Sequence, residues 1–190
     1  MTYEKLDYDG SLIHSRFAYK TIGKDIARFP FGWIYATRGN MDVKENLIDL
    51  EDKINNDFIY SDDALSFCWE IPNMNAAGAV FFQRLFVHEI ADLLRSGAYG
   101  KLDIEVQGDD LMCRKHGMED FGKASVSITK VTENTALGHL GLNINAGSKA
   151  PSFAFSLFLD DDQTAFLCKR IVKIFYEILE DVFIATTKVL

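Results

Sequence analysis

Three stretches in the middle of the chain decide its fold: QGDDL at residues 107–111, GKASVSI at 122–128 and LGHLGLNIN at 137–145. In the second and third stretches, apolar residues alternate with small or polar ones, which is the pattern of a half-buried β-strand. Leu140, Leu142 and Ile144 face one way, and the residues between them face the other. We therefore expect three strand pieces of one sheet, each with polar groups on the side away from the core.

Two charged positions in these stretches are candidates for chemistry. Asp109 and Asp110 directly follow a strand and Gly108, where two carboxylates can hold a divalent cation or orient an amine or a ribose hydroxyl. Gly-Asp-Asp is equally ordinary turn chemistry. Lys123 opens the next strand, where an ammonium group can reach a bound anion or an acyl carbonyl that gains negative charge. The alternative is a solvated lysine at a strand end.

The third stretch carries His139 and Asn143 on its polar face. Gly138 and Gly141 remove side chains beside them, which allows a ligand or another backbone to approach closely. A bulge or a barrel-like bend explains the glycines equally well. His139 is either a ligand-binding group or a hydrogen-bonded core histidine.

Taken in order, QGDDLMC, GKASVSI and LGLNIN resemble the motifs of the catalytic domain shared by biotin and lipoate protein ligases. In that superfamily a strand ends in an Asn-Asp turn, a second strand opens with a catalytic lysine, and the next reads GINVN or similar. The resemblance covers residues 64–145, including ALSFCWEI and the helical stretch 76–95 that follows it. It implies the class II synthetase-like fold of those ligases.

The resemblance also implies roles for individual residues. Lys123 corresponds to the lysine that contacts the acyl carbonyl and the α-phosphate, and Asp110 to the aspartate near ATP and its metal. Asp109 replaces the family's asparagine and adds a charge. Ser125 and Ser127 are expected to face the pocket for the acid. ATP and Mg²⁺ are the cofactors that the resemblance implies.

The chain departs from the ligase pattern in two places. The glycine- and arginine-rich loop of biotin ligases has only a partial echo at residues 37–40, which makes Arg38 and Gly39 candidates for ligand binding. Octanoyl transferases of the superfamily use a cysteine after the third strand, and this region, AGSKAPSFAFS, has none. The acids of LIDLED, residues 47–52, are further site candidates, and a solvated surface is the alternative.

The chain as a whole resembles a small, mainly archaeal family of unknown function. The phrases YDGSLIHSRFAY at residues 8–19, GNMDV at 39–43 and LIDLED carry this resemblance. It implies no activity.

The remaining pattern predicts an α+β fold with a mixed, mostly antiparallel sheet flanked by helices. Helical periodicity covers residues 76–95, with Gly97 as its stop, and a second helix follows the three aspartates at 160–162 and runs to about 183. Strands are expected at 31–36, around 58–60, and at 64–71 and 102–106. We expect a single domain over 1–190, with a variable N-terminal part (1–60), a ligase-like core (61–150) and a C-terminal strand and helix (151–190).

Composition excludes several classes of function. The net charge of −8, with 28 acidic and 20 basic side chains, argues against a nucleic-acid-binding protein. No apolar run reaches membrane-spanning length, and the polar start is not a signal peptide. Three widely spaced cysteines indicate neither a disulfide framework nor a zinc site, so we expect a reducing, cytoplasmic location.

Three hypotheses for function follow. The first is ATP-dependent activation or transfer of a small carboxylic acid by a ligase-like enzyme. The second is a non-catalytic protein that binds a small acid or a nucleotide in the same pocket. The third is an interaction protein, in which free strand edges and the apolar C-terminal helix form a homodimer.

Overall fold

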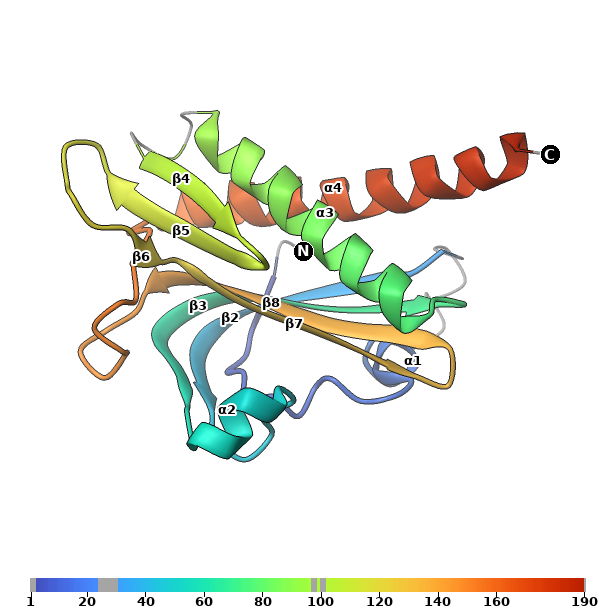
Figure 1. Cartoon of the computed structure of the whole chain (residues 1–190), viewed down its shortest axis with the longest axis horizontal. Coiled ribbons are helices and arrows are strands. Elements are labelled where there is room, and N and C mark those ends of the chain that lie inside the picture. Colours follow the sequence, from blue (N-terminus) through green and yellow to red (C-terminus); the bar gives the residue numbers. More distant parts are fainter. Residues whose placement is uncertain (1–2, 24–30, 97–98, 100–101, 190) are drawn as a thin grey trace.

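A five-stranded sheet forms the centre of the computed structural model, which describes residues 3–23, 31–96, 99 and 102–189 (Figure 1). Its strand order is β1-β2-β3-β8-β7, and all neighbours run antiparallel except β1 and β2. The strands are β1 (Glu4–Lys5), β2 (Trp33–Val43), β3 (Ile59–Pro72), β7 (Ser125–Thr132) and β8 (Thr135–Asn145). The prediction of an α+β fold with a mostly antiparallel, mixed sheet is confirmed.

A second, smaller antiparallel sheet contains β4 (Leu102–Gln107), β5 (Asp110–Lys115) and β6 (Gly122–Lys123). The expectation that the three central stretches share one sheet is therefore wrong. QGDDL forms the β4–β5 turn of the small sheet, and GKASVSI passes from the small sheet to the large one at Ala124. Alternation predicts that a segment is a strand, but it does not say which strand lies beside it.

Two long helices, α3 (Ala76–Arg95) and α4 (Asp161–Lys188), cover one face of the large sheet, as Figure 1 shows. The Asn75 side chain accepts a hydrogen bond from the Gly78 N–H at the start of α3, and Asp160 forms a capping box with Gln163 at the start of α4. Both predicted helices are confirmed, although α4 continues past 183. Gly97, the predicted stop of α3, lies outside the described residues.

Alternation in β8 sorts its side chains between the two faces of the sheet as predicted. Leu140, Leu142 and Ile144 join the main core under α3 and α4, where the Trp69 ring makes T-shaped contacts with Phe82 and Phe86 of α3. Gly138 pairs with Trp69 across the sheet, and a Cβ atom at this glycine would overlap the Trp69 ring. This close approach, rather than a bulge, explains the glycine.

The opposite face of the large sheet carries a smaller apolar cluster, which includes Tyr8, Phe17 and Met41. The short helices α1 (Phe17–Ile22) and α2 (Leu50–Asn55) lie on this side. The strands expected at 58–60 and 64–71 are one continuous strand, β3, with an irregularity in its pairing with β8 at Asp63. No helix in the described part of the chain is both long and apolar enough to cross a bilayer.

The C-terminal strand expected after Pro151 is reduced to a single bridge between Ala154 and Lys123 in the described structure. The segment 153–158 is nevertheless fixed by backbone hydrogen bonds. Leu157 N–H donates to the Asn143 carbonyl, and Phe158 N–H donates to the Ile144 carbonyl, each at 2.9 Å. The segment therefore lies beside the ends of β6 and β8.

Candidate functional site

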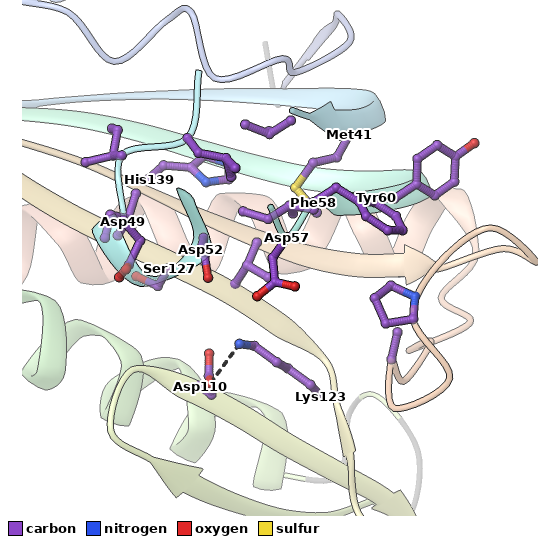
Figure 2. Close-up of a pocket in the computed structure, with 18 of the residues that line it drawn as sticks. Met41, Asp49, Asp52, Asp57, Phe58, Tyr60, Asp110, Lys123, Ser127 and His139 are labelled. Carbon is purple, nitrogen blue, oxygen red and sulfur yellow. Dashed lines mark ion pairs between the residues drawn. The ribbon is translucent and has the colours of Figure 1, made fainter. Parts of the chain in front are cut away.

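A pocket of about 630 Å³ lies between residues 46–58, which include α2 and are called the α2 region, and the strands that carry the central motifs (Figure 2). Asp110, Lys123 and Asn143, which come from both sheets, all line it. Its volume is in the range of small-molecule sites. Apolar side chains provide much of the remaining wall: Met41, Val43, Leu47, Phe58, Val126 and Ile128.

Lys123 is held in this pocket through its backbone. Its N–H donates to the Phe153 carbonyl at 2.7 Å, and its carbonyl accepts from the Phe155 N–H at 2.8 Å and from Nδ2 of Asn143 at 3.2 Å. Its Nζ lies 2.9 Å from Oδ2 of Asp110. Burial raises the pKa of Asp110, and the Lys123 ammonium opposes that rise. The two central candidates thus form a half-buried ion pair at the pocket wall.

Asp109 is oriented by α3. Nη1 of Arg84 lies 2.9 Å from one of its carboxylate oxygens, and Nε2 of Gln83 donates to the other at 2.9 Å. The same amide nitrogen lies 2.9 Å from Oγ of Ser127. Sequence reasoning missed Gln83 and Arg84. The signal that could have found Gln83 is its place among the apolar residues of a helix, because a buried amide needs hydrogen-bond partners.

His139 and Asn143 are buried polar residues with unused hydrogen-bonding atoms. They are 3% and 4% exposed, and neither Nε2 of His139 nor Oδ1 of Asn143 has a partner among the described residues. The His139 ring stacks on Tyr8 with 3.8 Å between ring centroids. Burial lowers the pKa of His139 to about 3, so the imidazole is neutral at pH 7. His139 is both a core residue and part of the pocket wall.

Carboxylates surround the single lysine. Among the described residues that line the pocket, six are acidic and Lys123 alone is basic. Figure 2 shows Asp52 and Asp57 across the pocket from Asp110 and Lys123. Burial raises the pKa of Asp52, and the neighbouring charges of Asp49 and Asp57 raise it further. The acids of LIDLED therefore belong to the pocket rather than only to a solvated surface.

The structure does not bring every predicted residue to the pocket. Arg38 pairs with Asp63 at 2.8 Å and with Asp161, at the start of α4, at 2.7 Å, so it joins β2 to β3 and α4. A Cβ at Gly39 would meet the N-terminal segment at Leu6.

Ser125 and Gly141, which were also predicted at the site, are not among the residues that line the pocket. The Oγ of Ser125 is buried and accepts the Leu111 N–H at 2.8 Å. Gly141 leaves room for the Met41 sulfur, which a Cβ would meet at 2.8 Å. Cys68, Cys113 and Cys168 are buried, and no cysteine is among the described lining residues.

The donor set does not fit Mg-ATP well. Among the described residues, no group of three or more histidine, cysteine or acidic side chains is arranged to hold a metal ion. Asp109 and Asp110 are already paired with Arg84 and Lys123. A triphosphate would face six carboxylates and one ammonium group, which makes its binding electrostatically unfavourable.

The low pKa of His139 predicts a specific pH dependence of stability. In the unfolded chain the pKa of His139 is about 6.5, and in the folded chain it is about 3. Between these two pH values the imidazole is protonated only in the unfolded chain, so the folded state loses stability as the pH falls. His139→Phe, which retains an aromatic ring beside Tyr8, removes this linkage. Between pH 7 and pH 5 the wild type should lose about 2 kcal/mol more of its unfolding free energy than the variant. Urea denaturation at both pH values measures the difference, and parallel losses would contradict a buried neutral imidazole.

Comparison with solved structures shows the fold. A protein of unknown function from Pyrococcus horikoshi is 27% identical, with a TM-score of 0.81 over 98% of this chain and 94% of that one. A putative lipoate protein ligase from Thermoplasma acidophilum with bound lipoic acid is 13% identical, with a TM-score of 0.57 over 92% and 85% of the two chains. The biotin protein ligase of Aquifex aeolicus is 10% identical, with a TM-score of 0.52 over 94% and 69%. The expected biotin and lipoate ligase-like fold is confirmed.

Sequence comparison gives the family but no activity. No curated protein matches the chain. A family model described as a domain of unknown function, DUF366, matches residues 1–190, which agrees with the resemblance of the whole chain to a family of unknown function. The chain belongs to the DUF366 family.

Proposed function

We propose that this protein binds a small carboxylic acid, with the acid's carboxylate beside Lys123. The observation that carries the proposal is that Asp110, Lys123 and Asn143 line one pocket in a fold shared with lipoate and biotin ligases. The structure of the Thermoplasma acidophilum protein holds lipoic acid, which is such an acid.

The geometry around Lys123 supports this orientation of the ligand. The N–H and the carbonyl of Lys123 are both hydrogen-bonded, which limits the positions that its ammonium group can take before a ligand arrives. A carboxylate can join or replace Asp110 as its partner and form a charge-assisted hydrogen bond. The apolar side chains of the α2 region, including Leu47 and Phe58, then offer a surface for the carbon chain.

Acid activation is the second candidate function. It is favoured by the place of Lys123, where an ammonium group can stabilise negative charge on an acyl oxygen. It is disfavoured by the acidic lining, which repels a nucleotide. Binding is therefore the function that the geometry supports best, and activation requires its own test.

Binding at Lys123 predicts a clear effect of removing that side chain. In isothermal titration with lipoate, biotin, octanoate and ω-amino acids of similar length, at least one acid should bind, and Lys123→Ala should weaken its binding about tenfold or more, because a charged hydrogen bond contributes about 1.5–3 kcal/mol. The matched control is Lys173→Ala, on the exposed surface of α4, which should leave the affinity unchanged. Binding that survives Lys123→Ala unchanged, or no binding by any acid, would refute the proposal.

Pyrophosphate exchange separates activation from binding. If the protein activates the acid that it binds, exchange between labelled pyrophosphate and ATP should saturate with that acid and disappear in Lys123→Ala, because the charge that develops on the acyl oxygen loses its partner. If an acid binds at Lys123 but no pyrophosphate exchange is measured, the protein binds the acid without activating it, and the second candidate function is refuted.

A further inference from the structure

We propose that the acid recognised by this pocket also carries an ammonium group, which lies against Asp52 and Asp57 across the pocket from Lys123. This inference rests on the proposed function for the position of the carboxylate, and it adds the chemical class of the rest of the molecule. A zwitterion with its two charges at opposite ends of a short carbon chain matches the distribution of charge in the lining.

The first support is the excess of negative charge. The described lining holds six carboxylates, and the basic side chains near them are committed: Lys123 to Asp110 and Arg84 to Asp109. A ligand with only a negative charge would add to the repulsion. A ligand that brings its own cation reduces it.

The second support is the state of the carboxylates themselves. The Asp52 and Asp57 side chains have no hydrogen-bond or ion-pair partner within the described part of the chain. Figure 2 shows both on the wall that faces Lys123. Burial and the charges of Asp49 and Asp57 raise the pKa of the half-buried Asp52, and the Lys123 ammonium offsets only part of that rise.

The third support is independent of the acidic cluster. Oδ1 of Asn143, a residue 96% buried, has no hydrogen-bond partner among the described residues, although Nδ2 of the same amide donates to the Lys123 carbonyl. His139 belongs to the same pocket wall and is 97% buried, and its Nε2 also has no partner within the described part of the chain. Unsatisfied buried polar atoms are rare, and in a pocket they indicate where a ligand supplies the missing partner. A ligand that carries N–H donors can satisfy such acceptors, whereas a carboxylate alone cannot.

A divalent cation is the other way to neutralise these acids. The described residues hold no group of three or more metal-ligating side chains in a suitable arrangement, which favours an organic cation. The experiment includes Mg²⁺ so that the two can be told apart.

Three six-carbon probes test the inference: 6-aminohexanoate, hexanoate and hexylamine, titrated calorimetrically into the full chain at pH 7. We expect 6-aminohexanoate to bind about tenfold more tightly than hexanoate, the effect of one charge-assisted contact. Hexylamine should bind as well, and its affinity should not depend on Lys123. Asp52→Asn and Asp57→Asn should remove the preference for the amino acid while leaving hexanoate unaffected or improved.

The matched control is Asp181→Asn, an exposed position on α4, which should keep the preference. Any of three results would overturn the inference. The first is equal affinity for 6-aminohexanoate and hexanoate, and the second is a preference for 6-aminohexanoate that survives both Asp52→Asn and Asp57→Asn. The third is displacement of hexylamine by Mg²⁺ at submillimolar concentration. Failure of the proposed function looks different: the amine-dependent preference would persist, but Lys123→Ala would not weaken any acid.

Discussion

Both the N–H and the carbonyl of Lys123 are hydrogen-bonded at the point where the chain leaves the small sheet for the large one. Phe153 and Phe155 supply the backbone partners, and the Asn143 amide donates to the same Lys123 carbonyl. The next residue, Ala124, is buried and links both sheets, because its N–H donates to Leu111 and its carbonyl accepts from Asn143. The position of the ammonium group, its pairing with Asp110 and the wall of the pocket all depend on this crossing.

The described lining of the pocket carries an excess of negative charge. Its lysine is paired with an aspartate, the acidic turn is held by Arg84 and Gln83, and the α2 region adds further carboxylates opposite them. A site of this kind discriminates by repulsion as much as by attraction, since an anionic nucleotide or a simple fatty acid meets uncompensated negative charge. The same charge attracts a molecule that carries a cation.

Much of the fold and part of the site could be predicted from the sequence. Alternation in LGHLGLNIN assigned both faces of β8 correctly because its period is local, and the aspartates at 160–162 indicated the start of α4 because capping is also local. The division into two sheets could not be predicted, because strand pairing is decided by contacts between distant residues.

The same limit applies to individual side chains. Arg38 is an ordinary candidate in sequence, but Asp63 and Asp161, far along the chain, hold it away from the pocket. Gln83 contacts the site only because the β4–β5 turn lies against α3, and this contact could not be predicted from the spacing of residues in the sequence. The acids of the α2 region were recognised as a cluster, but their position opposite Lys123 required the fold.

A crystal structure of the protein with bound 6-aminohexanoate is the most direct measurement of the arrangement argued for. We expect the probe in this pocket, with a carboxylate oxygen within about 3 Å of Nζ of Lys123 and the ammonium group beside Asp52 and Asp57. A probe bound in the reverse direction, or bound outside the space between the two walls, would contradict it.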